Sequence, residues 1–409
     1  MRCAVVGGGI IGLSIASRLA SRGVEVLVYD AWAAASPALA PPPWASPSVA
    51  SASGSSSGSV MPVGAQSKQA GERPGAWFVA AGMLAAGNES TWESAELGAL
   101  MVESARRWPG FAAELGVRLP EDGTLVVALT ADDVAEAERE WARQTDESAR
   151  LGGTERLGAG ERVGAAGRPG EFGQASAALV AEPGGRRLGP SGLRELEPAL
   201  SPRVRAGCYL PGDWQVDPRK VVAALRERVS VVPGRVVDLG GIDADQVVVA
   251  AGVGTGALTG LPVRPVKGEV LRLRGEPGLL RHVVSGYADG RRVYLVPRED
   301  GEIVVGATQE ERADDAVTAG AVLDLLRAAV DLVPALADCA ITETLVGHRP
   351  STPDNAPLLG RLDKRTVVAV GHHRNGVLLA PVTADLIAGL VVTGEPDPLI
   401  VPFAPGRFA

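Results

Sequence analysis

The sequence predicts an α/β protein in which a Rossmann-like domain is interleaved with an antiparallel-sheet α+β domain. Three observations support this fold class. Residues 3–30 form a strand, helix, strand pattern around a glycine-rich turn, and residues 266–308 form successive strands joined by the turns "EPG" and "EDGE". A last short strand, "TVVAVG", is followed by an apolar helix after residue 375, so strands and helices alternate again in the C-terminal part of the sequence.

Composition excludes several classes of protein. The 409 residues allow two domains, and 40 basic against 48 acidic residues give a net charge of -8 without a dense run of one sign. We therefore expect no nucleic-acid partner. Cys3, Cys208 and Cys339 lack metal-ligand spacing, which favours a reduced cytoplasmic protein without a metal site. No apolar run reaches the ~18 residues of a membrane span, and the N-terminal glycines argue against a signal peptide.

The first motif is "VVGGGIIG", which places Gly7, Gly9 and Gly12 between a strand and a helix. Gly7 permits a tight turn, Gly9 lets the backbone approach a pyrophosphate, and Gly12 allows close helix–strand packing. Asp30 ends the next strand, where a carboxylate can bind ribose hydroxyls. The motif predicts dinucleotide binding, although NAD and FAD proteins share it.

A second glycine pattern, Gly252-x-Gly254-x-x-Ala257, follows the buried strand "QVVVAAG". It fits either a second nucleotide site or a strand that ends under the first cofactor. The preceding segment lacks a βαβ unit with its own acidic residue, so we favour the second interpretation.

Between these motifs the sequence predicts two low-complexity insertions, 31–76 and 152–185, which lack the large apolar residues of a core. Helices are expected around 94–116, from 131 onward and at 319–336, and a strand at 123–130. The pair Asn375-Gly376 is expected to start the last helix, with Pro381 in its first turn.

Two side chains are candidates for substrate contact. Arg349 ends a strand in "VGHRPSTPDNAPLLG", where its guanidinium can hold a carboxylate through two hydrogen bonds. Tyr294 lies in "RRVYLVPRED". From spacing alone, a structural ion pair for Arg349 and simple packing for Tyr294 are the better interpretations. The adjacent His372 and His373 have no carboxylate partner at metal-site spacing.

Six motifs in order, "VVGGGIIG", "AAGMLA", "RPVKGEVLRLRG", "YLVPREDGEIVVGAT", "GHRPSTPDNAPLLG" and "GHHRNGVLLAP", resemble the FAD-dependent D-amino-acid oxidase superfamily. The thiamine-pathway glycine oxidases are most similar. The resemblance implies that FAD is the cofactor and that Arg349, Arg374 and Tyr294 are the catalytic residues that contact substrate. It implies cofactor contacts from Gly7, Gly9, Ile10, Ile11, Gly12, Asp30, Ala81, Gly82, Met83, Val236, Gly252, His372, His373, Asn375, Gly376, Val377 and Leu378.

The implied reaction is oxidative deamination of glycine, sarcosine or small D-amino acids to an imino acid, with O2 reduced to H2O2. The imino acid would pass to thiazole synthase for thiamine, and a homo-oligomer is compatible with the resemblance. One alternative is a D-amino-acid dehydrogenase or oxidase of other specificity. Another is a catalytically impaired FAD-binding protein, because Trp77 and Phe78 stand where the family has small residues. A nicotinamide dehydrogenase would rest on the three glycines alone.

The resemblance also predicts how the chain is divided. We expect an FAD-binding domain from residues 1–118, 191–264 and 347–409. The substrate domain would comprise 119–190 and 265–346.

Overall fold

The computed structural model describes residues 1–32, 60–61, 75–85, 94–139 and 185–408. The two predicted low-complexity insertions therefore lie outside the described residues, except for residues 31–32, 60–61, 75–76 and 185. The helix expected from residue 131 is described as far as residue 139.

A six-stranded sheet contains the glycine-rich motif at its centre. Its order is β17-β18-β11-β1-β2-β9, and all neighbours are parallel except β17 and β18. The βαβ unit predicted for residues 3–30 is confirmed, and β11 lies beside β1. The strands are β1 (Arg2–Val6), β2 (Glu25–Asp30), β9 (Ser230–Pro233), β11 (Gln246–Val249), β17 (Leu358–Arg361) and β18 (Thr366–Val370).

An eight-stranded, mainly antiparallel sheet forms the second half, in the order β16-β12-β15-β14-β13-β5-β7-β6. The antiparallel strands predicted between 266 and 308 are confirmed, but β13 was not predicted. The strands are β5 (Thr124–Ala128), β6 (Arg186–Leu188), β7 (Ala206–Leu210), β12 (Arg264–Arg274), β13 (Val283–Ala288), β14 (Arg291–Pro297), β15 (Glu302–Gly306) and β16 (Ala340–Ser351).

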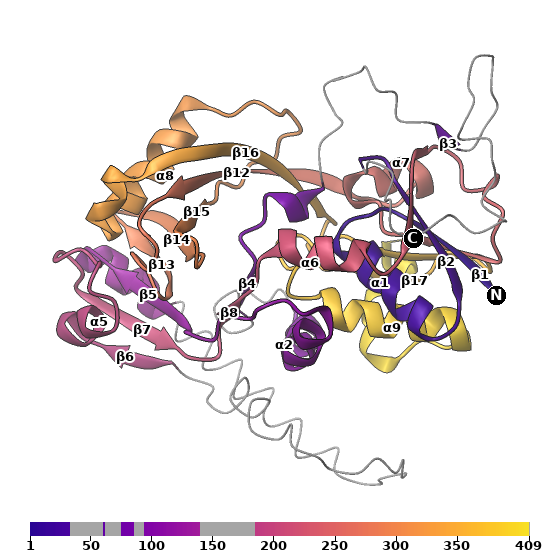
Figure 1. Cartoon of the computed structure of the whole chain (residues 1–409), viewed down its shortest axis with the longest axis horizontal. Helices are drawn as coiled ribbons and strands as arrows, with labels where there is room; N and C mark the ends of the chain where they lie inside the picture. The colour runs from indigo at the N-terminus through magenta and orange to yellow at the C-terminus, as the bar shows by residue number, and fades with distance from the viewer. Residues whose placement is uncertain (33–59, 62–74, 86–93, 140–184, 409) are drawn as a thin grey trace, which may run out of the picture.

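Helices cover one face of each sheet (Figure 1). In the six-stranded half, α1 (Ile10–Ser21) packs on α9 (Ala380–Thr393) and α6 (Pro218–Arg226), and α2 (Ala95–Leu115) packs on both α9 and α6. In the eight-stranded half, α8 (Ala319–Leu332) and α5 (Pro190–Leu196) pack on the outer face. The short helix α7 (Thr255–Thr259) follows β11 of the six-stranded sheet. Two pairs of two-residue strands complete the structure, β3 (Val60–Met61) with β10 (Arg235–Val236) and β4 (Met83–Leu84) with β8 (Trp214–Gln215).

Alternation of side chains divides the eight-stranded sheet between two environments. Leu271, Leu295 and Val305 join the core under α8, whereas Val270 and Val304 join a smaller cluster on the opposite face. Successive residues of a strand point to opposite faces, so each of these strands contributes to both clusters. The smaller cluster faces the six-stranded half, toward which the long strands β12 and β16 extend (Figure 1).

The structure differs from the sequence-based predictions in two details. Helix α9 begins at Ala380, and residues 376–379 are turns, so the prediction that Asn375-Gly376 starts the helix was wrong. Strand β7 lies inside the range 191–264 but pairs with β5 in the eight-stranded sheet. The division into domains otherwise stays a prediction.

Among the described helices none is alone long and apolar enough to cross a membrane, although the bent pair Ala380–Thr393 and Pro398–Phe408 passes by length and composition.

Candidate functional site

A cavity of about 930 Å³ lies between the two sheets, at the carboxyl ends of β1 and β11. Open α/β sheets bind ligands at this edge because the loops there leave backbone groups free. The residues after β1 and β11 meet in this one cavity, which supports a single nucleotide site and not two. Its lining includes Gly7, Gly8, Gly9, Ile10, Ile11, Asp30, Val236, Gly252, Gly254 and Ala257.

The glycine-rich turn fits the roles predicted for it. Gly7 has a φ of +118°, and a Cβ on it would lie 2.3 Å from the carbonyl oxygen of Ala250. A Cβ on Gly12 would lie 1.9 Å from the Gly7 oxygen, so Gly12 serves helix–strand packing and does not line the cavity. Gly9 is the N-cap of α1 and provides no side-chain cap. The first N–H groups of α1 therefore face the cavity without intrahelical partners.

Asp30 lies at the end of β2, as predicted, but its carboxylate already has partners. Arg226 donates to Oδ2 at 2.5 Å, and the backbone N–H of Trp32 donates to Oδ1 at 3.2 Å. Asp30 is 9% exposed. The ion pair leaves the carboxylate at the cavity wall with part of its charge neutralised.

Arginines fix the strip that contains Ala81, Gly82 and Met83. The Phe78 carbonyl accepts from Arg219 at 3.0 Å, and the Ala81 carbonyl accepts from Arg298. Burial lowers the pKa of Arg298 to about 10, which still leaves it charged at neutral pH. The strip lines the cavity beside β16, where a Cβ on Gly347 would lie 3.1 Å from Val79 Cβ. Its position is thus set by side chains of both halves.

Arg349 lies near the end of β16 and lines the cavity. Its Nη1 donates to the carbonyl oxygens of Lys267 at 3.3 Å and Thr308 at 3.2 Å. A Cβ on Gly268 would lie 2.6 Å from that same nitrogen. Gly268 therefore leaves the space in which the guanidinium crosses β12 toward the cavity.

Tyr294 is placed in a similar way. It lines the cavity from β14 and lies opposite Gly306 of β15 in the antiparallel register. A Cβ on Gly306 would lie 2.4 Å from the Tyr294 hydroxyl oxygen. A glycine on a neighbouring strand thus makes room for each of the two predicted substrate-contact side chains.

A buried lysine anchors the loop beside Arg349. Lys267 is fully buried, and its Nζ lies 3.2 Å from Glu269 Oε1 and 3.1 Å from Asp314 Oδ1, and donates to the Ala316 carbonyl at 2.6 Å. The hydrogen bond from Lys267 is the main cause that lowers the pKa of Asp314 to about 2. The anchored loop contributes Gln309, Ala313 and Asp315 to the cavity.

The two adjacent histidines are held by protein groups. His372 Nε2 lies 3.1 Å from Thr383 Oγ1, and His373 Nδ1 lies 2.6 Å from Ser351 Oγ. The backbone N–H of His373 also donates to the Pro350 carbonyl at 3.0 Å. Both residues line the cavity. His373 joins the segment before α9 to β16, and the His372 side chain joins that segment to α9 itself.

The rest of that segment divides into cavity residues and supporting residues. Arg374, Gly376 and Val377 line the cavity, and in the described part of the chain the N–H groups of Gly376 and Val377 donate to no protein acceptor. Asn375 and Leu378 do not line it. The Leu378 carbonyl accepts hydrogen bonds from the side chains of Ser104 and Trp108 of α2. The backbone carbonyl of Asn375 accepts from the backbone N–H of Leu379.

Burial lowers the pKa of His372 to about 3. Burial, then the charges of Arg349, Arg374 and Arg264, lower the pKa of His373 to about 4. Both histidines are therefore neutral at pH 7. The ordinary pKa of a histidine side chain is 6.5. As the pH falls below 6.5, the two histidines therefore take up protons in the unfolded chain but stay neutral in the folded chain.

We therefore predict that the free energy of unfolding falls below pH 6.5 by about 1.4 kcal/mol per pH unit for each histidine. Urea unfolding of the holoprotein between pH 7 and pH 4 measures this slope. His373→Asn keeps a residue that tolerates the positive φ of 47° at this position and should remove one part of the slope. An identical slope in the variant would exclude His373 as a contributor.

Several cavity residues were not predicted from the sequence. Trp32, Trp77, Gln309 and Asp315 line the cavity, and Gly268 and Gly306 shape it. The glycines had a signal, because glycine inside a strand often marks close approach of another group. The other four come from loops, turns or a short 3-10 helix, and local spacing in the sequence does not reveal the spatial neighbours of such segments.

A family model for FAD dependent oxidoreductases, called DAO, matches residues 2–390, and the chain belongs to this family. FAD is therefore its cofactor, and the protein is an oxidoreductase.

Particular relatives narrow the comparison. The chain is similar to the bifunctional protein ThiO/ThiG of Synechocystis sp., at 38% identity over 239 residues, or 53% of this chain and 36% of the relative. It is also similar to glycine oxidase of Geobacillus kaustophilus, at 34% identity over 51% of this chain and 62% of the relative. These alignments thus span less than two thirds of either relative. The crystal structure of the Geobacillus kaustophilus glycine oxidase matches 99% of both chains with a TM-score of 0.72 and 27% identity.

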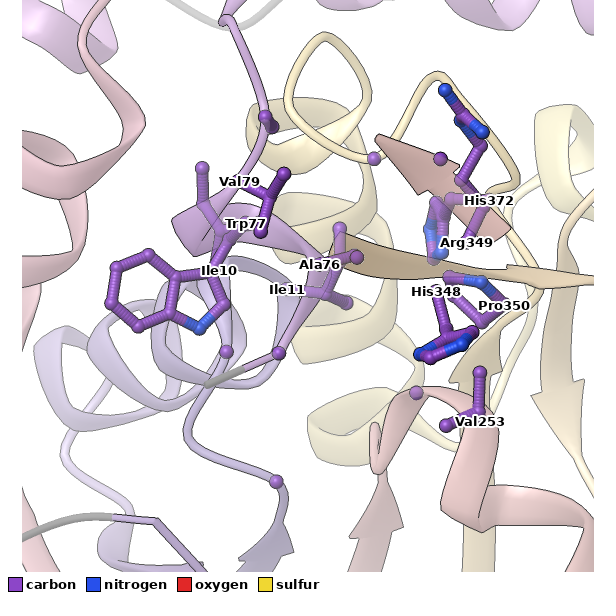
Figure 2. Close-up of a pocket in the computed structure, with 18 of the residues that line it drawn as sticks. Ile10, Ile11, Ala76, Trp77, Val79, Val253, His348, Arg349, Pro350 and His372 are labelled. Carbon is purple, nitrogen blue, oxygen red and sulfur yellow. The ribbon is translucent and has the colours of Figure 1, made fainter. Parts of the chain in front are cut away.

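The residues present fit FAD. The cavity is of a size that holds a large organic ligand. It runs from the unpaired N–H groups of α1, which suit a pyrophosphate, to the side chains on β14 and β16. Figure 2 shows Ile10, Ile11 and Trp77 on one side and His348, Arg349 and His372 on the other.

Proposed function

We propose that this protein oxidises glycine and small amines or D-amino acids, such as sarcosine, to the corresponding imino acids. Two electrons and two protons leave the substrate, and O2 accepts them to give H2O2. Bound FAD supplies the two-electron acceptor. The observation that carries the proposal is the convergence of Arg349, Tyr294 and Arg374 on one cavity with the glycine-rich turn.

In this proposal Arg349 binds the substrate carboxylate, since a guanidinium can donate two parallel hydrogen bonds to it. Tyr294 closes the same site from β14, and Arg374 contributes a second cation at the cavity wall. Fixed orientation of the α-carbon is the main contribution of these side chains, because positioning alone lowers a barrier substantially.

The metabolic role we propose is supply of iminoglycine for the thiazole of thiamine. Its support is the resemblance to relatives named bifunctional ThiO/ThiG, in which one chain bears both names. We infer that thiazole synthase receives the product.

The test is the absorbance spectrum of the purified protein without oxygen, before and after addition of substrate. We expect glycine and sarcosine to bleach the flavin band and, in air, to yield H2O2. Bleaching by D-alanine or D-proline but not glycine would favour an amino-acid oxidase of other specificity. Bleaching without H2O2 in air would favour a dehydrogenase. A flavin that no amine bleaches would identify a catalytically impaired FAD-binding protein.

A further inference from the structure

Trp77 lines the cavity, but the site described above gives it no role. It lies in a short 3-10 helix, Ala76–Phe78, beside the N-terminus of α1 (Figure 2). A Cβ on Gly9 would lie 3.3 Å from Trp77 Cδ1 and 3.8 Å from Trp77 Nε1. The pyrrole edge of the indole, with its N–H, therefore faces the N-cap of α1.

The indole N–H has no acceptor among the described residues. A tryptophan side chain can donate one hydrogen bond and accept none, and it usually finds a partner when buried. Trp77 is half-buried and lines the cavity. Beside it, the first N–H groups of α1 also lack intrahelical partners. Several donors thus gather at one place without a protein acceptor, which is the arrangement that binds an anion.

Neighbouring side chains fix the orientation of the ring. Trp32 and Phe78 pack edge-on against Trp77, with ring centroids 6.3 and 5.6 Å away. The guanidinium of Arg219 lies 3.7 Å from the Phe78 ring centroid, and that of Arg226 lies 5.9 Å from the Trp77 ring. These contacts hold the indole in one position and add positive charge behind it.

We infer that the indole N–H of Trp77 donates a hydrogen bond to the pyrophosphate of bound FAD, opposite the N-terminus of α1. The pyrophosphate is the anionic part of the dinucleotide, and the glycine-rich turn places it at this helix end. The inference rests on FAD as cofactor and does not depend on which amine is oxidised. Trp77 thus becomes a cofactor-binding residue.

Equilibrium titration of the apoprotein with FAD tests this directly. Trp77→Phe keeps an aromatic ring but removes the donor, and we expect the Kd for FAD to rise about tenfold. The matched control, Trp214→Phe, removes an indole N–H that donates to the Pro211 carbonyl at 3.0 Å outside the cavity lining, and it should change the Kd by less than about twofold. Equal effects of the two variants, or tighter binding by Trp77→Phe, would overturn the inference. Tighter binding would show that the ring obstructs the cofactor.

A second measurement keeps the test valid if Trp77→Phe does not fold. The indole ¹H–¹⁵N signals of the wild-type apoprotein are followed while ADP or adenosine is added. Assignment comes from selective loss of one signal in Trp77→Phe or, failing that, Trp77→Tyr. We expect the Trp77 signal to move downfield with ADP and to stay in place with adenosine, which has no phosphate. A Trp77 signal that ADP leaves unmoved contradicts the inference.

Discussion

Arg349→Ala should lower kcat/KM for amino-acid oxidation by about 10³-fold, because a paired carboxylate loses both of its charged donors. The purified variant should remain yellow, since the glycine-rich turn and the strip around Gly82 are unchanged. Steady-state oxygen consumption and the ratio of flavin to protein absorbance measure the two effects separately.

Two further variants sharpen this result. Arg349→Lys keeps the charge but cannot form the two-pronged contact, so its loss should be intermediate. Arg203→Ala, at an exposed ion pair with Asp331, should leave turnover at the wild-type level. Wild-type turnover in Arg349→Ala would remove this residue from the substrate site. A colourless Arg349→Ala protein would instead assign Arg349 to the cofactor.

Lys267→Met should destabilise the holoprotein by about 3–5 kcal/mol, because it leaves the fully buried carboxylate of Glu269 without its cation. It should also raise KM, since Nζ no longer holds the loop through Asp314 and the Ala316 carbonyl. Urea unfolding at pH 7 and steady-state kinetics are the measurements.

The control for this prediction is Lys220→Met, which makes the same change at an exposed site on α6. Its unfolding free energy should stay within about 0.5 kcal/mol of the wild type. A combined Lys267→Met, Glu269→Gln protein should recover part of the stability, because the uncompensated charge is then gone. Equal stability of the two single variants would mean that the buried pair contributes nothing.

The sequence was sufficient to predict the βαβ unit and the family, because the signals for these features are local. Gly7, Gly9 and Gly12 have the spacing that one turn requires, and Asp30 ends the following strand. Arg349 was correctly expected at the end of a strand. The roles predicted for Arg349, Tyr294 and Arg374 remain predictions, although these side chains line one cavity.

Other features depend on pairings between distant segments, which a local pattern does not contain. The burial of Lys267 follows from the pairing of β12 with β16, in which Lys267 lies opposite His348. The late start of α9 has a local cause as well, because residues 376–379 form turns before Pro381 can enter the first helical turn. Neither the aromatic contacts of Trp77 nor the Asp30–Arg226 ion pair could be read from spacing.

The packing of α1 against α9 has a consequence for synthesis of the protein. The βαβ unit at residues 2–30 is made before its partners, because α6 follows at residues 218–226, β11 at residue 246 and α9 at residues 380–393. Until then the face of α1 that packs on α9 has no partner. A nascent chain therefore cannot complete this unit before α9 has been made, and chains stalled earlier should require a chaperone to avoid aggregation.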